Sequence, residues 1–141
     1  MARKDARDVA MRLLYQWSIT GETAVEQALS LFEDVTLEQE DLVYIGETIR
    51  GVLKAREPVD EQIERFSKNW RIQRMPAVDL AVLRLAVYEL LEKRDVPPKV
   101  VAKEAADLAQ KYGNEKSADF VTGLLGRIIA QNALLEDKQD S

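Results

Sequence analysis

PAVDLAVLRLAVYELL, residues 76–91, is the stretch that decides the fold. At about 100° per residue its aliphatic side chains leave no continuous polar face, and Asp79, Arg84 and Glu89 are isolated polar points. Pro76 suits the first turn of a helix and Pro97 cannot continue one, so the pattern predicts a single helix between them. A helix that is apolar all round must be covered on several sides, and the remaining helices should pack around it.

Amphipathic patterns predict shorter helices before and after this central one. The apolar residues recur at i, i+3 and i+4 in the ranges 4–19, 23–32, 36–54, 58–69, 98–112 and 114–131. The sequence therefore predicts an all-α single domain of about seven helices, with Trp70 in its core. We expect the domain to span residues 1–131, followed by a polar and frayed tail over residues 132–141. Pairs of glycines at 46 and 51 and at 123 and 126 predict close approaches between helices.

Composition excludes several classes of site. The 141 residues contain no cysteine and no histidine, which removes the usual ligands of zinc and the commonest general base. No phosphate-binding glycine loop or catalytic triad is present, so we expect neither an enzyme nor a cofactor. The apolar runs are too short to span a bilayer and no signal peptide precedes them, which predicts a cytoplasmic protein. With a net charge of −5, any nucleic-acid binding must depend on a local basic patch.

One line of residues on the first predicted helix is such a candidate. Lys4, Arg7, Met11 and Tyr15 fall within about 80° of one another on a helical projection. A basic and aromatic line of this kind can contact phosphates and bases. The alternative is an ordinary solvated face with a half-buried tyrosine, and spacing alone favours that alternative.

Four blocks of the sequence resemble a known family. RKDARDVAMRLLYQW, RMPAVDLAVLRLAVYELL, VPPKVVAKEAADLAQKYG and SADFVTGLLGRI occur in the order typical of the NusB family of bacterial transcription antitermination factors. The resemblance covers almost the whole chain and implies two small helical bundles packed at an angle. It also implies binding of single-stranded boxA RNA in ribosomal RNA leaders, together with the small-subunit ribosomal protein NusE. The resemblance further implies that this complex joins RNA polymerase, that it needs no cofactor and that it catalyses no reaction.

The resemblance also assigns candidate residues for RNA binding. The arginine-rich N-terminus of the family corresponds to Arg3, Lys4 and Arg7, which favours the basic line over the solvated face. The FVNG element of the last helix reads Phe120 to Gly123 here, with Thr122 in place of asparagine. Threonine offers one hydroxyl where asparagine offers an amide and a carbonyl, so a two-point base contact is lost. Lys116, with Lys111, is expected to restore positive charge nearby.

Two further residues are assigned to the protein partner. The tyrosine of the family that faces the ribosomal protein corresponds to Tyr15, and an acidic residue at the start of the central helix corresponds to Asp79. The acidic charge balance and Thr122 leave a second hypothesis open, a protein–protein adaptor with little RNA affinity. The RNA-binding domain of a ribosomal RNA cytosine methyltransferase shares the fold by resemblance, but a stand-alone methyltransferase is not expected without a catalytic domain. A homodimer that covers the basic line is a further alternative.

Overall fold

The computed structural model describes residues 4–22, 36–68, 70–93 and 95–140, and within these ranges the chain is helical, with no strand. This confirms the predicted all-α class, whereas the helix predicted at 23–32 lies outside the described residues. The elements are α1 (Lys4–Thr20), α3 (Gln39–Lys54), α4 (Arg56–Phe66), the 3-10 helix η2 (Ile72–Arg74), α5 (Ala77–Glu92), α6 (Pro98–Tyr112) and α7 (Ser117–Asp140).

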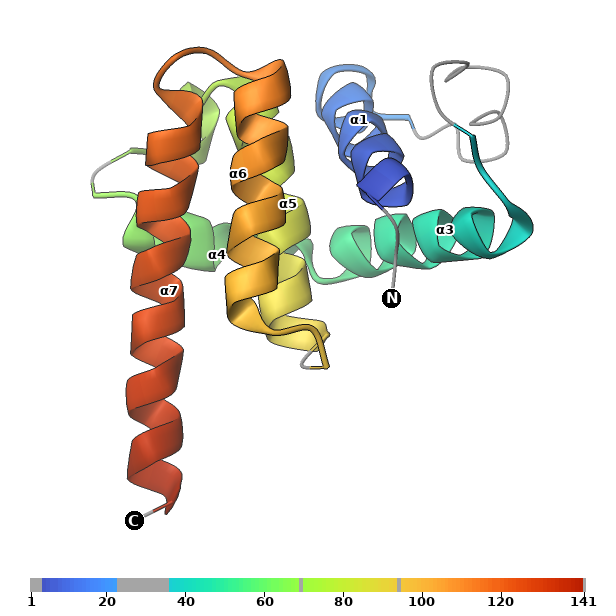
Figure 1. The fold of residues 1–141 in the computed structure, drawn as a ribbon. Coiled ribbons are helices and arrows are strands. Elements are labelled where there is room, and N and C mark those ends of the chain that lie inside the picture. The colour runs from blue at the N-terminus through green and yellow to red at the C-terminus, as the bar shows by residue number, and fades with distance from the viewer. Residues whose placement is uncertain (1–3, 23–35, 69, 94, 141) are drawn as a thin grey trace.

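Helix α5 is the centre of the molecule, as its sequence predicts. Every residue from 79 to 89 is buried, including the polar ones. α5 contacts α1, α3, α4, α6 and α7. Figure 1 shows α1 and α3 grouped on one side of α5, with α4, α6 and α7 on the other. The fold is therefore two small groups of helices that share one apolar helix.

The ends of the surrounding helices follow local chemistry. α3 begins later than predicted because Glu38 and Asp41 form a capping box, in which the Glu38 N–H donates to Asp41 Oδ2 at 2.8 Å. α6 begins at Pro98, where the missing N–H costs nothing. α7 continues to Asp140, past the boundary predicted at residue 131, and fraying of this end in solution stays a prediction. No helix in the described ranges has the length and apolarity needed to cross a membrane.

A cluster around Trp17 fixes the C-terminal half of α1 against α4 and α5. The guanidinium carbons of Arg56 and Arg84 lie 5.5 and 5.3 Å from the centroid of the Trp17 ring. Arg84 also donates two hydrogen bonds to the carboxylate of Asp60, at 2.9 and 3.0 Å. Both contacts combine charge with a planar geometry that arginine favours.

The helix glycines differ in what surrounds them. A Cβ on Gly51 would collide with the ring and hydroxyl of Tyr88, so this position confirms the predicted close approach of α3 to its neighbour. Gly126 has no heavy atom within 4 Å of such a Cβ, and at Gly123 only Arg127, from the same helix, is that near. The prediction of tight helix contacts at Gly123 and Gly126 is therefore wrong, because this face of α7 is open.

This contrast gives a paired stability prediction. Gly51→Ala is expected to destabilise the fold by about 1–3 kcal/mol, because the buried Tyr88 must move. Gly126→Ala is expected to stabilise it by about 1 kcal/mol, because alanine is the better helix former and nothing opposes its methyl group. Urea unfolding of both variants measures the two changes. Equal effects of the two substitutions would contradict the packing described here.

Candidate functional site

Arg7 is not a surface residue. Only 3% of it is exposed, and Met11 on the same line is buried as well. Its Nη2 donates to Glu89 Oε2 of α5 at 2.7 Å. The prediction that Arg7 belongs to an exposed basic line is therefore wrong, because the central helix supplies a carboxylate that draws the guanidinium inward. Lys4 is exposed as predicted, and Arg3 lies outside the described residues.

Tyr44 of α3 lies close to the pair formed by Arg7 and Glu89. Burial raises the pKa of the Glu89 carboxyl above its ordinary value, although Arg7 acts in the opposite direction. Burial, with the charge of Glu89 second, raises the pKa of Tyr44 to about 12. A charge pair of this kind joins α1 to α5. Removing only one of its two partners destabilises the fold, because the other charge is left buried without compensation.

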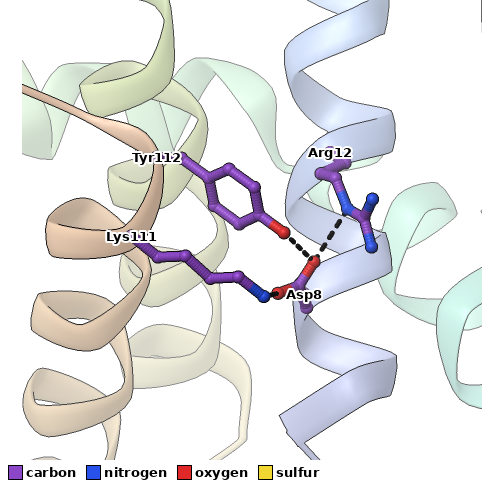
Figure 2. A network of polar contacts seen from close by, with 4 residues as sticks. All are labelled: Asp8, Arg12, Lys111 and Tyr112. Carbon is purple, nitrogen blue, oxygen red and sulfur yellow. Dashed lines mark hydrogen bonds and ion pairs between the residues drawn. The ribbon is translucent and has the colours of Figure 1, made fainter. Parts of the chain in front are cut away.

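A second set of charges joins α1 to α6. Asp8 accepts from Lys111 Nζ at 2.8 Å and from the Tyr112 hydroxyl at 2.6 Å, and lies 2.7 Å from Arg12 Nε. Figure 2 shows the two helices contributing these groups from opposite sides to one carboxylate. Hydrogen bonding to Asp8 is the main cause that raises the pKa of the Lys111 ammonium. Lys111 was expected near the last helix as free positive charge, whereas here its charge is shared with Asp8.

Tyr15 lies at the surface, as its predicted role toward a partner requires. It is 37% exposed, and Ile19, one turn further along α1, is 61% exposed. The two side chains form a small apolar surface at the C-terminal half of α1. The contact with a partner protein itself stays a prediction.

The position of Asp79 differs from the surface position that its predicted role toward a partner requires. It is 3% exposed, on the first turn of α5, and the Ser117 side chain hydrogen-bonds to it. Its Oδ1 has no hydrogen-bond partner among the described residues. Burial is the main cause that raises the pKa of the Asp79 carboxyl, and Ser117 opposes the shift. Contact with a partner protein stays a prediction, but the carboxylate does not reach the surface in this structure.

The raised pKa of Asp79 makes a prediction about pH. A carboxyl whose folded pKa lies above its unfolded value of 3.8 binds more protons in the folded state, so its contribution to stability falls as the pH rises through the folded pKa. Asp79→Asn keeps an oxygen for Ser117 but removes this titration. We expect the variant to gain stability relative to the parent as the pH rises from about 4 to neutrality, by the order of 1 kcal/mol. Urea unfolding at both pH values tests this, and an unchanged difference would contradict it.

Trp70 and Phe120 form an aromatic corner where α4 and α7 meet. Trp70 is 51% exposed, so its predicted place in the core is wrong. Its ring lies 6.2 Å from that of Phe120, centroid to centroid, at an angle of 56°. Phe120 is half-buried in the first turns of α7 and supports the exposed indole from one side.

The loop that carries Trp70 is held by two side chains. Ser67 Oγ contacts the carbonyl oxygens of both Glu64 and Trp70, at 3.0 and 2.5 Å. Arg127 of α7 donates from Nε to the carbonyl oxygen of Phe66 at 2.8 Å. These bonds satisfy the last carbonyl groups of α4 and fix the direction in which the chain leaves it. Trp70 is therefore exposed on a loop tied at both sides.

Charged residues surround the aromatic corner on its α4 side. Trp70 lines a wide, shallow hollow together with four cations and four carboxylates: Arg56, Arg65, Lys68, Arg71, Glu57, Asp60, Glu61 and Glu64. The hollow has no excess of one charge, so it does not by itself attract a polyanion. The loop cations nevertheless stand next to an aromatic face, a combination that suits stacked bases and their phosphates.

The remaining predicted RNA residues lie along the start of α7. Lys116 and Thr122 are exposed, and the Lys116 N–H donates to Asn114 Oδ1 at 2.8 Å. Thr122 follows Phe120 by two positions, so the two side chains leave the helix in nearly opposite directions. The structure brings Phe120 together with Trp70, which sequence reasoning missed, and does not bring it together with Thr122.

The comparisons with known proteins agree with this fold along the whole chain. The model of the NusB family matches residues 4–130. A protein of Acetivibrio thermocellus named transcription antitermination protein NusB is 38% identical over 141 residues, which cover 100% of this chain and 97% of the relative.

Solved structures give the same result. T. maritima NusB has a TM-score of 0.78 and 32% identity, covering 91% of this chain and 92% of its own. A chain of the crystal structure of antitermination factors NusB and NusE in complex with dsRNA has a TM-score of 0.76 and 31% identity, covering 89% of this chain and 94% of its own. With these similarities along its whole length, the chain belongs to the NusB family of transcription antitermination proteins.

Proposed function

We propose that this chain is an RNA-binding adaptor that holds boxA-type leader RNA of ribosomal RNA operons together with the small-subunit ribosomal protein NusE. In this role it acts in the cytoplasm as part of a complex with RNA polymerase, without a cofactor and without catalysing a reaction. Membership of the NusB family supports this proposal, as does the similarity to a chain of the structure of NusB and NusE in complex with dsRNA.

The observation that carries the RNA part is the aromatic corner. A tryptophan that is half exposed, braced by Phe120 and held on a tied loop, is a preorganised stacking surface. Bases stack on such surfaces with little dependence on sequence, and Lys68 and Arg71 stand beside it for the phosphates. Lys116, just before α7, extends this surface in our proposal. Thr122 leaves α7 on nearly the opposite side from Phe120, so any RNA contact that it makes is a separate one, and Arg7 is left out because it is buried.

A second candidate function is an adaptor that binds its protein partner with little RNA affinity. The net charge of −5 and the balanced charges of the hollow around Trp70 favour it. The exposed pair Tyr15 and Ile19 would serve either candidate as the partner surface.

One titration separates the two candidates. Fluorescence anisotropy of a labelled boxA-type single strand is measured against this protein, with and without the ribosomal partner, over a range of salt concentrations. The RNA-binding adaptor predicts tighter binding with the partner present, and a slope of log K against log salt near −2 for about three phosphate contacts. Normal partner binding with no RNA contribution would establish the second candidate instead.

A further inference from the structure

The turn between α6 and α7 is closed by bonds among its own residues. The Asn114 N–H donates to Ser117 Oγ at 3.0 Å, and the Lys116 N–H donates to Asn114 Oδ1 at 2.8 Å. The Ser117 N–H also donates to the Asn114 carbonyl oxygen, at 3.1 Å. Gly113 packs closely against the same group, because a Cβ there would collide with Ser117 Oγ. Residues 113–117 therefore form one unit around the Ser117 hydroxyl.

The Ser117 hydroxyl also joins this turn to the central helix. Ser117 is 1% exposed, and a hydroxyl has a single proton to donate. Its oxygen accepts from the Asn114 N–H, and its proton is donated to the carboxylate of Asp79, in the first turn of α5. Hydrogen bonds therefore run in series from the backbone of the turn, through Ser117, to α5.

Packing does not explain the presence of a carboxylate at position 79. Asp79 is buried, and its Oδ1 has no hydrogen-bond partner among the described residues. Burying a carboxylate with one oxygen unpaired costs free energy, so an apolar side chain would serve the core better. The bond to Ser117 supplies a different reason, because the buried hydroxyl proton needs an acceptor and Asp79 provides it.

The turn that Asp79 holds carries Lys116 at the surface. Lys116 stands between two exposed carboxylates, Glu115 and Asp119, so residues 113–119 contain one cation and two anions. Such a segment does not attract phosphate over a distance. A phosphate contact here depends instead on the direction of the ammonium group relative to the two carboxylates. The backbone of the turn sets that direction, and the Lys116 N–H is one of its bonded groups.

We propose that Asp79 is a positioning residue for the RNA surface: through Ser117 it fixes the α6–α7 turn, and thereby the direction in which Lys116 meets a phosphate. The inference rests on the proposed RNA-binding function, in which Lys116 takes part. It gives Asp79 a role different from the partner contact that the resemblance implies, because the carboxylate is buried and bonded to the turn.

The first test is the anisotropy titration with the labelled boxA-type strand, using full-length variants and a saturating concentration of the ribosomal partner. Asp79→Ala and Ser117→Ala are each expected to bind about fivefold more weakly at low salt, with a slope of log K against log salt shallower by about 0.7, the loss of one phosphate contact on a single strand. Asp79→Asn keeps an oxygen for Ser117 and should restore the affinity and slope of the parent. Lys116→Gln should reproduce the loss. Adding Asp79→Ala to Lys116→Gln should cause no further loss, because both changes remove the same contact.

A second measurement follows the turn without RNA. Amide hydrogen exchange of Asn114 and Lys116 is expected to be about tenfold faster in Asp79→Ala, although these amides donate to Ser117 and Asn114 rather than to Asp79. Asp79→Asn should exchange as the parent does. Asp41→Ala is the matched control, because it removes a buried carboxylate from the first turn of α3, where it accepts the Glu38 N–H. It should weaken the fold but leave the exchange of the turn and the salt slope unchanged.

The outcomes separate this inference from the proposed function. If the parent binds RNA while Asp79→Ala keeps its slope and its exchange rates, the RNA function stands and this inference is overturned. A loss of slope in Asp41→Ala equal to that in Asp79→Ala would also overturn it, because a weaker fold would then explain both. Weaker partner binding by Asp79→Ala, with normal partner binding by Ser117→Ala, would return Asp79 to the partner contact and overturn its positioning role. Absence of RNA binding by the parent, with the partner present, would overturn the proposed function and this inference with it.

Discussion

Trp70→Ala is expected to weaken RNA binding by about 10-fold to 100-fold while leaving the fold intact. Removing one stacked aromatic side chain costs about 1–3 kcal/mol per base in single-strand complexes. Trp70 is 51% exposed and lies on a loop held by Ser67 and Arg127, so its truncation opens no cavity in the core. Fluorescence anisotropy with the ribosomal partner present measures the loss, and circular dichroism checks the fold.

The control for this experiment keeps the ring and changes its size. Trp70→Phe should retain most of the affinity, because a phenyl ring still stacks on a base. Phe120→Ala should lower affinity as well, since it removes the support from one side of the indole. If Trp70→Ala bound RNA as tightly as the parent, the aromatic corner would have no part in RNA recognition, and the proposal would lose the observation that carries it.

Glu89→Ala is expected to destabilise the fold by about 3–5 kcal/mol, the largest effect on stability that we expect from one substitution. It leaves the guanidinium of Arg7 buried at 3% exposure without its carboxylate, and an uncompensated charge in the interior costs about this much. Urea unfolding at neutral pH, with the midpoint and slope fitted together, measures the change.

A double substitution and a surface substitution serve as controls for Glu89. Arg7→Met with Glu89→Leu removes both charges at similar volume, and should recover most of the lost stability. Lys103→Gln removes an exposed cation and should change stability by less than about 1 kcal/mol. A loss of equal size in the double variant would mean that packing, rather than the unpaired charge, explains the effect of Glu89→Ala.

The central helix was predictable from sequence because its signal is local and strong. Residues 76–91 carry apolar side chains on every face between two proline signals, and the helix forms at Ala77–Glu92. The helix predicted at 98–112 forms at Pro98–Tyr112 for the same reason, since a proline opens it and Gly113 follows it. Where neighbouring residues determine both the first turn and the apolar period of a helix, tertiary contacts change its boundaries little.

The burial of Arg7 could not be predicted, because its partner Glu89 lies 82 positions away in the sequence. Helical periodicity correctly places Arg7 beside Lys4 on one part of α1, but does not say that α5 will cover that part and offer Glu89 to it. Glu89 itself looked like an isolated polar point on an apolar helix. Two such points on different helices are a signal for a buried pair, but only once the helices are known to touch.

Trp70 was misjudged for a related reason. Tryptophan is buried on average, so the default prediction is core. The helix predicted at 58–69 ends at Phe66 in the structure, so Lys68, Trp70 and Arg71 lie in a connection, and loops run over the surface. The Gly126 prediction failed because glycine in a helix was taken to mean a neighbouring helix, whereas the open face of α7 shows no atom near it.

The position of α5 has a consequence for how the molecule opens. Because every other described α-helix contacts it, the amide protons of residues 79–89 are expected to exchange with solvent deuterium only when the whole chain unfolds. Neither group of helices has a separate hydrophobic core that would keep it folded when the other group unfolds. A protein whose two groups of helices share one central helix in this way would lose the proposed RNA surface and the proposed partner surface in a single unfolding event.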